Sequence, residues 1–197
     1  DLTGHAQVQP GYAPAGWTTL VQHLHTLGVT EDEMLAAGVA TTASTGRLID
    51  RFRDRAVFPI RHEGVILGFV GRRHPDRTND DKAGPKYLNT GDTPLFHKGD
   101  QLYVTGPLGP DVTPVIVEGP MDAIAVTLAT DGKYLGVAPL GTSLTDEQAA
   151  QLRLLGYRTP IVATDADLAG RVAAERDYWI LTPQLLQPRY AACLFYT

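Results

Sequence analysis

Four acidic side chains are the residues of this 197-residue chain whose types and spacing best suit chemistry. Glu118 and Asp122 follow one short apolar run, and Asp165 and Asp167 follow a second run further along the chain. Carboxylates brought close together repel one another unless a cation lies between them, and hard divalent cations prefer oxygen ligands. The pattern therefore predicts a site for divalent metal ions.

The elements that must position these acids are parallel strands. The runs 114–118 and 160–164 are rich in Val and Ile, are bounded by Pro or Gly, and precede helical patterns. These features indicate buried strands in βαβ units. Ligands of such sheets bind outside the carboxyl ends of the strands. We therefore expect all four acids at one edge of a sheet.

The rest of the C-terminal half alternates regularly between strand and helix patterns. Thr145 and Gln148 form a capping box, which supports one of the helices. Further strands are expected at 134–138 and near 190–196, and helices at 121–129, 145–155 and 168–181. The alternation predicts a parallel sheet with flanking helices.

The N-terminal half has a different pattern, typical of an α+β fold. Apolar residues at helical spacing predict an amphipathic helix over 14–28, and Thr30 is a candidate N-cap for a second helix over 31–37. The period then changes to that of strands, and Glu63-Gly64 is a turn signal in the middle of an antiparallel hairpin over 57–70.

Charge is distributed unevenly along the chain. The net charge is −4 over residues 1–45, +4 over 46–98 and −5 over 99–197. A basic middle beside an acidic, metal-seeking end suits a phosphodiester polymer together with divalent cations. Clustering of ordinary solvated surface charge is the alternative interpretation.

Composition narrows the cellular setting. The longest apolar runs are far shorter than the roughly 20 residues that span a bilayer, and no secretion signal is evident. The single cysteine, Cys193, excludes an intramolecular disulfide and a cysteine-based zinc ribbon. We therefore expect a cytoplasmic protein with no zinc and no membrane attachment. Because no exposed apolar stripe is evident, we also expect a monomer.

Two acidic segments carry a family resemblance. Glu-Gly-Pro-Met-Asp at 118–122 and Asp-Ala-Asp-Leu-Ala-Gly at 165–170 resemble the signatures of the Toprim domain. Toprim is the catalytic fold of bacterial-type primases, type IA and type II topoisomerases and some nucleases. The segment 138–145 between them resembles the Leu-Gly-Thr segment of bacterial DnaG-type primases.

Segments of the N-terminal half resemble the primase-specific subdomain that precedes Toprim and that topoisomerases lack. These segments are 11–14, 51–60, 68–72, 85–89 and 93–99. The combined resemblance implies the RNA polymerase core of a DnaG-type primase. The implied fold is a smaller α+β subdomain over 1–105, followed by an α/β Toprim domain over 106–197.

Three parts of the family pattern are not found in the sequence. They are the zinc-binding domain, the domain that docks the replicative helicase, and a third acidic segment of the Asp-Pro-Asp type. The third segment is expected roughly where the chain stops, at Thr197. We therefore expect a Toprim domain truncated at its C-terminal end, and a helicase partner only through regions absent here.

The resemblance implies roles for the four acids. Asp165 and Asp167 would bind Mg²⁺ or Mn²⁺, with two ions expected, and Asp122 would be a further ligand directly or through water. Glu118 would be either a ligand or the group that handles the hydroxyl proton. A structural alternative stays open, because Asp122 and Asp167 lie near helix starts, where carboxylates are favoured.

The resemblance also implies contacts to template and nucleotide. The expected residues are Arg53, Arg55, Arg72, Lys86, Tyr87, Asn89 and Lys98. Arg51, Arg53 and Arg55 alternate as in a strand and would point three guanidiniums to one face, whereas Asp50 and Asp54 could simply pair with them.

Two small-residue positions have open interpretations. Gly141 follows the strand expected at 134–138 and could offer its amide to a phosphate, although a structural turn is the commoner role. Gly170 is expected to allow close packing of a helix.

The resemblance implies synthesis of short RNA primers on single-stranded DNA from ribonucleoside triphosphates. Two alternatives use the same residues. A Toprim nuclease would hydrolyse phosphodiesters with the same acids, but would have no need of the primase-like segments. A non-catalytic, single-stranded-DNA-binding module of a mobile-element protein would retain the acids without turnover.

Overall fold

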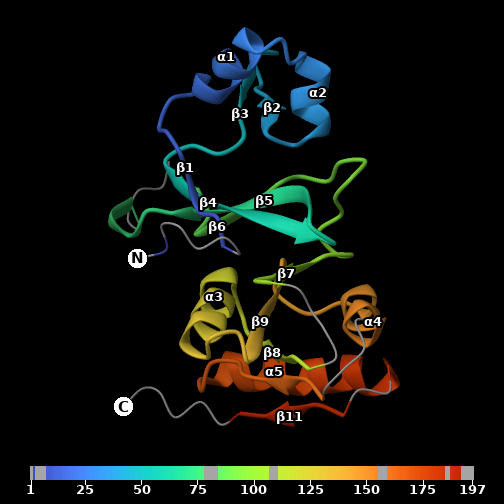
Figure 1. The fold of residues 1–197 in the computed structure, drawn as a ribbon. Helices are drawn as coiled ribbons and strands as arrows, with labels where there is room; N and C mark the ends of the chain where they lie inside the picture. The colour runs from blue at the N-terminus through green and yellow to red at the C-terminus, as the bar shows by residue number, and fades with distance from the viewer. Residues whose placement is uncertain are drawn as a thin grey trace. The chain divides into compact units, whose positions relative to one another are not determined.

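The computed structural model describes residues 2, 8–77, 84–106, 111–154, 159–184 and 187–191. The chain divides into two compact units, residues 1–97 and 98–197 (Figure 1). Among the described residues, no helix is long and apolar enough to cross a bilayer.

The first unit contains a four-stranded antiparallel sheet in the order β1-β4-β5-β6 and a separate two-stranded sheet of β2 and β3. Its strands are β1 (Gly11–Ala13), β2 (Ala40–Thr42), β3 (Leu48–Asp50), β4 (Arg55–His62), β5 (Val65–Arg73) and β6 (Tyr87–Asn89). The predicted hairpin is confirmed as β4 and β5. Its turn residues, Glu63 and Gly64, have φ angles of 48° and 83°, the left-handed pair that tight hairpins require.

Both predicted helices of the first unit are present, as α1 (Thr19–Thr26) and α2 (Glu31–Ala36). A 3-10 turn, η1 (Pro75–Arg77), lies in the segment after β5. Thr30 caps α2 in a full capping box with Glu33, as its sequence position predicted. Helix α1 begins five residues later than predicted. The reason is long-range, because the Asp50 carboxylate accepts the N–H groups of Leu20 and Val21 at 2.8 and 2.9 Å.

The second unit is a five-stranded sheet in the order β11-β10-β8-β9-β7. Its elements are β7 (Leu102–Val104), β8 (Thr113–Ile116), α3 (Pro120–Ala129), β9 (Tyr134–Pro139), α4 (Asp146–Leu154), β10 (Ile161–Val162), α5 (Leu168–Leu181), η3 (Thr182–Gln184) and β11 (Arg189–Tyr190). The predicted parallel sheet is confirmed for four strands. Strand β7 was not predicted, and it pairs antiparallel with β9. The predicted boundary between 105 and 106 leaves β7 in the first domain, whereas the compact units divide at 97/98.

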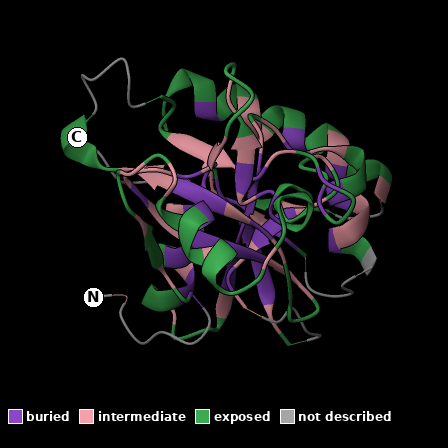
Figure 2. Ribbon diagram, turned by 90° about the horizontal axis from the view of Figure 1, so that it is seen from above, coloured by how far each residue is buried: buried purple, intermediate pink, exposed green. Residues whose placement is uncertain are grey.

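The core of the second unit lies between its sheet and two of its helices. Ile116, Val137 and Val162 from the strands meet Leu152 of α4 and Leu181 of α5 in one buried cluster. Over the described residues as a whole, Figure 2 shows buried residues mainly in strands and exposed residues mainly on helices and loops. The parallel pairing places the carboxyl ends of β10, β8 and β9 side by side, and the candidate site lies at this edge.

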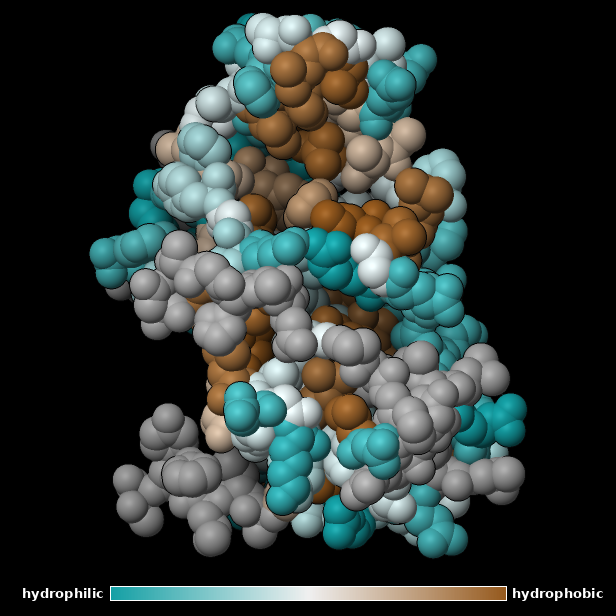
Figure 3. Space-filling model, viewed as in Figure 1, coloured by the Kyte–Doolittle hydropathy of each residue, from teal (hydrophilic) through white to brown (hydrophobic). Residues whose placement is uncertain are grey.

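Exposed apolar side chains gather on helices in both units. Figure 3 shows one such patch over the α1–α2 pair, where Leu20, Leu27 and Leu35 are exposed. On α5, Leu168 and Trp179 are exposed by 78% and 65%. The expectation of a surface without apolar stripes is therefore wrong for α5, and the monomeric state stays a prediction that sedimentation would test.

Candidate functional sites in the two units

Glu118 and Asp165 lie together at the carboxyl edge of the second sheet. Strand β8 pairs in parallel with β10, so the residues that follow the two strands emerge side by side. The backbone N–H of Asp165 donates a hydrogen bond to Glu118 Oε1 at 3.0 Å. Both side chains are exposed. This contact brings together two of the four predicted acids and leaves the Asp165 carboxylate open to solvent.

The other two acids lie at helix starts. Asp167 is the N-cap of α5, and its Oδ1 accepts the N–H of Gly170 at 2.8 Å. Asp122 lies in the first turn of α3, where the helix macrodipole favours negative charge, and it is exposed. The N-cap position expected for Asp167 is therefore confirmed. The cap does not use the second carboxylate oxygen, and the metal role of Asp167 stays a prediction.

The four acids were expected at one edge of the sheet with two divalent ions, and the side chains do not form a compact ligand cluster. Within the described ranges, no three His, Cys, Asp or Glu side chains lie close enough to hold one metal ion. The reason is that Asp167 is turned toward the amides of α5 and Asp122 is carried on α3. The chemistry of the donors still fits a hard divalent cation, because exposed carboxylates are its preferred protein ligands.

The segment 140–145 joins β9 to α4 at the same edge of the sheet. The capping box is confirmed, since Thr145 and Gln148 exchange hydrogen bonds at 3.1 Å in both directions. Thr145 Oγ1 also donates to the carbonyl oxygen of Gly99 at 2.6 Å. Gly141 lies against the Lys98 side chain, because a Cβ at this glycine would be 3.3 Å from Lys98 Cε. The segment therefore packs beside the Lys98 side chain.

Asp177 is a buried carboxylate that sequence reasoning missed. It lies on α5 with 4% of its surface exposed, and it accepts a hydrogen bond from the backbone N–H of Leu144. Its Oδ1 has no hydrogen-bond partner among the described residues. The pKa of Asp177 is raised to about 6, mainly by burial; the charge of Arg176 and the hydrogen bond from the Leu144 N–H lower it, and the charge of Glu118 makes a smaller contribution that raises it. Its helical position predicted nothing unusual, because burial here depends on tertiary packing.

The raised pKa predicts that the chain loses stability as the pH rises from about 4 to 6. The folded state binds the Asp177 proton more tightly than the unfolded state, so this contribution is complete below the ordinary pKa of 3.8 and is lost through about 6. Its size is of order 2–3 kcal/mol. Asp177→Asn should therefore be more stable than the unsubstituted chain at pH 8 and nearly equal at pH 4 in urea unfolding. If Asp177→Asn changed the free energy of unfolding by the same amount at pH 8 and at pH 4, the raised pKa of Asp177 would be contradicted.

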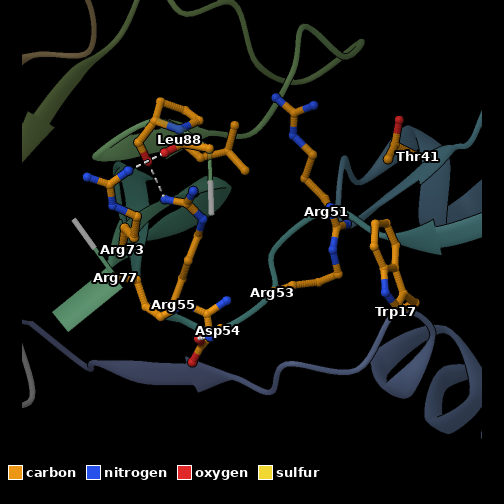
Figure 4. A pocket seen from close by; sticks show the side chains of 11 residues that line it. Trp17, Thr41, Arg51, Arg53, Asp54, Arg55, Arg73, Arg77 and Leu88 are labelled. Atoms are coloured by element: carbon orange, nitrogen blue, oxygen red, sulfur yellow. Dashed lines mark hydrogen bonds and ion pairs between the residues drawn. The ribbon is translucent and has the colours of Figure 1, made fainter. Parts of the chain in front are cut away.

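The first unit has a pocket of about 420 Å³ that is rich in arginine (Figure 4). Its lining comprises Trp17, Thr41, Arg51, Arg53, Asp54, Arg55, Arg73, Arg77, Gly84, Pro85 and Leu88. Five guanidiniums and one carboxylate line the space, so its charge suits a polyanion.

The predicted strand through Arg51, Arg53 and Arg55 is wrong, although all three line the pocket. Strand β4 begins only at Arg55, because Asp54 has a left-handed φ of 51°. Asp54 accepts the Tyr12 hydroxyl and pairs with an arginine elsewhere, Arg77, at 3.1 Å. The Asp50 carboxylate serves α1 instead of these arginines.

Arg51 and Arg55 are partly committed to the fold. Arg55 is 4% exposed, and its Nη1 donates to the carbonyl oxygens of Pro85 and Gly71 at 2.8 and 3.3 Å. Two nitrogens of Arg51 donate to the Asn89 carbonyl oxygen at 2.9 and 3.2 Å. Burial lowers the pKa of both arginines. These contacts tie the pocket floor to β5, β6 and the segment before β6.

Two aromatic rings accompany the basic residues. The Arg53 guanidinium lies 4.3 Å from the centroid of the Trp17 ring, and Trp17 is 64% exposed. Sequence reasoning placed Trp17 on the apolar face of a helix, because no local signal relates it to an arginine 36 positions away. Arg72 lies 4.9 Å from the Tyr87 ring and Lys86 lies 5.7 Å from it. Each aromatic ring could stack on a nucleic-acid base, and the cation beside it could bind the neighbouring phosphate.

Comparison with known proteins decides the family. Residues 3–107 match the family described as DNA primase catalytic core, N-terminal domain, and residues 115–193 match the Toprim-like family. The DNA primase of Deinococcus radiodurans is 42% identical over 84% of this chain, and that of Escherichia coli K12 is 36% identical over 94%. The chain belongs to the bacterial DnaG-type primase family.

Solved DnaG structures share the fold of this DnaG-family chain. A DnaG primase catalytic domain bound to single-stranded DNA has a TM-score of 0.74 and 36% identity, and it covers 94% of this chain. The RNA polymerase domain of Mycobacterium tuberculosis DnaG has a TM-score of 0.76, 33% identity and 92% coverage. This chain covers 57% and 60% of those two structures, respectively.

The DnaG-family chain spans less than a third of the length of its curated relatives, with 28% of the Deinococcus radiodurans protein and 31% of the Escherichia coli protein. Toprim primases of this family generally use divalent metal ions. The two family matches thus include both units and both candidate sites.

Proposed function

We propose that the chain is a primase catalytic core that synthesises short RNA primers on single-stranded DNA from ribonucleoside triphosphates. The observation that carries the proposal is the contact between Glu118 and Asp165 at the carboxyl edge of β8 and β10, in a chain of the DnaG family. Template-dependent incorporation of labelled ribonucleotides, with Mg²⁺ and then with Mn²⁺, is the direct test.

The acids would hold the divalent ions of the family, with Mg²⁺ or Mn²⁺ as the expected species and two ions as the expected number. Asp165 and Asp167 offer carboxylates from one turn, and Asp122 is a further donor from α3. Bound ions would supply charge neutralisation at the phosphates and activation of the attacking hydroxyl. Glu118 orients the Asp165 turn through its hydrogen bond and is either a further ligand or an acceptor for the hydroxyl proton.

The basic residues would hold template and nucleotide. Trp17 and Arg53 present an exposed ring and a cation at the arginine pocket, which suits a single strand with an unpaired base. Tyr87, on β6, has the Arg72 guanidinium and the Lys86 ammonium within 6 Å of its ring centroid, at 4.9 and 5.7 Å, and it offers a second aromatic contact. In the first unit, this second set and Asn89 are proposed to bind nucleotide or template. In the second unit, Lys98 is proposed to bind phosphates.

Trp17→Ala should weaken binding to single-stranded DNA. Loss of one stacking platform costs about 1–3 kcal/mol, which corresponds to roughly 5- to 150-fold in Kd. Fluorescence anisotropy with a labelled oligodeoxynucleotide measures the change. Leu27→Ala removes a similarly exposed apolar side chain outside the pocket lining and serves as the control. An unchanged Kd for Trp17→Ala would exclude the stacking role.

Arg53→Gln should reduce the salt dependence of the same binding. Each phosphate contact contributes about 0.7 to the slope of log K against log salt for a single strand. Arg47→Gln removes an exposed arginine that lies outside the pocket lining, and it should leave the slope nearly unchanged. Equal slopes for the unsubstituted chain and Arg53→Gln would argue against a phosphate contact at this residue.

The two alternative functions are not favoured, because primases share both units of this chain. A nuclease would incorporate no labelled ribonucleotide in this experiment and would shorten the single-stranded DNA template. A non-catalytic module would bind the DNA without product in either metal.

A further inference from the structure

Helix α5 contacts the 140–145 segment through two consecutive residues. Arg176 Nη2 donates a hydrogen bond to the Thr142 carbonyl oxygen at 3.1 Å, and the Asp177 carboxylate accepts the N–H of Leu144. The side chain of Leu144 is buried in the core cluster beside Leu181. The Arg176 donor and the Asp177 acceptor thus bind the backbone of this segment at Thr142 and Leu144, two residues apart.

The same segment also contacts Lys98. Gly141 lies against the Lys98 side chain, and Gln148 Nε2 donates to the carbonyl oxygens of Lys98 and Gln101 at 3.2 and 2.7 Å. The Gly141 contact sets the space available to the lysine. A shift of the segment toward Lys98 would therefore displace its ammonium group, whereas a shift away would release it.

Burial of the Asp177 carboxylate lowers the stability of the folded state. A carboxylate that is 4% exposed, with one oxygen unpartnered among the described residues, destabilises the folded state relative to a well-packed apolar side chain. Leu at this position would match the apolar surroundings of α5. A residue that lowers stability and yet holds a segment of the site is better explained by positioning than by packing.

We propose that Arg176 and Asp177 are positioning residues that hold the 140–145 segment in the conformation that places Lys98 for the phosphates of an incoming ribonucleoside triphosphate. The role of Lys98 rests on the proposed function, whereas the hold on the segment does not. The two residues act through the backbone of Thr142 and Leu144, and neither contacts the nucleotide.

The test compares Asp177→Leu, Asp177→Asn and Arg176→Gln in the 197-residue chain, with Glu175→Gln as the control. Glu175 is the exposed neighbour on the same helix. Hydrogen exchange of residues 140–145 reports the hold on the segment. The KM for ribonucleoside triphosphates and the kcat of primer synthesis report its consequence, and thermal unfolding at pH 8 reports stability.

Asp177→Leu should raise the unfolding temperature, increase exchange at Leu144 by about tenfold, and raise KM about fivefold with a smaller change in kcat. Arg176→Gln should raise KM in the same direction. Asp177→Asn retains an acceptor for the Leu144 N–H and should restore both exchange and KM to within about twofold.

Unchanged exchange and unchanged KM in Asp177→Leu would overturn the proposal and leave Asp177 as a purely structural residue. If the unsubstituted chain makes no primers, the proposed function fails, and exchange at 140–145 still decides whether α5 holds the segment. In that case, calorimetry with a ribonucleoside triphosphate replaces KM, and equal affinity in Asp177→Leu would exclude the consequence for Lys98.

Discussion

Glu118→Gln and Asp165→Asn should each reduce primer synthesis by at least about 100-fold while leaving the fold intact. Gln keeps an oxygen that can accept the Asp165 N–H, and Asn keeps the size of Asp165, so both variants remove charge with little change in shape. Both residues are exposed, so their neutralisation carries little cost in stability. Labelled ribonucleotide incorporation on single-stranded DNA of mixed sequence measures the effect.

Asp131→Asn is the matched control for this experiment. Asp131 is exposed in the turn between α3 and β9, at the opposite edge of the sheet, and its φ of 50° suits Asn as well as Asp. The control should retain full synthesis.

Calorimetry with Mg²⁺ and Mn²⁺ separates the two roles of Glu118. Loss of metal affinity in Asp165→Asn but not in Glu118→Gln would assign Glu118 to proton handling, whereas loss in both would make it a ligand. Full synthesis by Asp165→Asn would refute the assigned site.

Gly170→Ala should destabilise the chain by about 3 kcal/mol or more and distort the acidic site at the same time. A Cβ at Gly170 would lie 2.1 Å from the Asp165 carbonyl oxygen and 2.9 Å from its backbone nitrogen. Backbone atoms cannot move aside as a flexible side chain can. The Asp165 turn must therefore shift, and with it the hydrogen bond to Glu118. The expectation that this glycine permits close packing is confirmed by these distances.

Substitutions at two other glycines serve as stability comparisons for Gly170→Ala. Gly136→Ala would place a Cβ 1.9 Å from the Ala123 carbonyl oxygen, between β9 and α3, so it should also destabilise the fold strongly. Gly91 has open space around its Cβ position and no left-handed φ, so Gly91→Ala should be neutral within about 0.5 kcal/mol. Urea unfolding measures all three. Gly170→Ala with unchanged stability and unchanged metal affinity would mean that the Asp165 turn is not packed as described.

The regular elements of the second unit could be predicted because their signals are local. Helix α5 has the predicted bounds, since Asp167 supplies the N-cap and residues three and four apart stabilise each turn. The capping box of Thr145 and Gln148 is another signal contained within four residues. Strand β7 was missed because three residues have no measurable period, and only pairing with β9 makes them a strand.

The first unit shows where local reasoning fails. The alternation of Arg51, Arg53 and Arg55 predicted a strand, but the left-handed Asp54 interrupts it. Asp50 was considered a partner for these arginines, yet its carboxylate binds the start of α1, thirty positions away. Such contacts depend on which segments the folded chain brings together, which no short window of sequence contains.

The candidate sites divide in the same way. The family resemblance, the two acidic turns and the basic segments could be predicted from the sequence, because residue types at fixed short spacing carry that information. Three features became visible only in the folded chain: Glu118 binds the Asp165 turn, Trp17 stacks with Arg53, and Asp177 is buried. The physical reason is that hydrogen bonding between adjacent strands, ring stacking and desolvation all depend on distances across the fold, and chain order does not specify these distances.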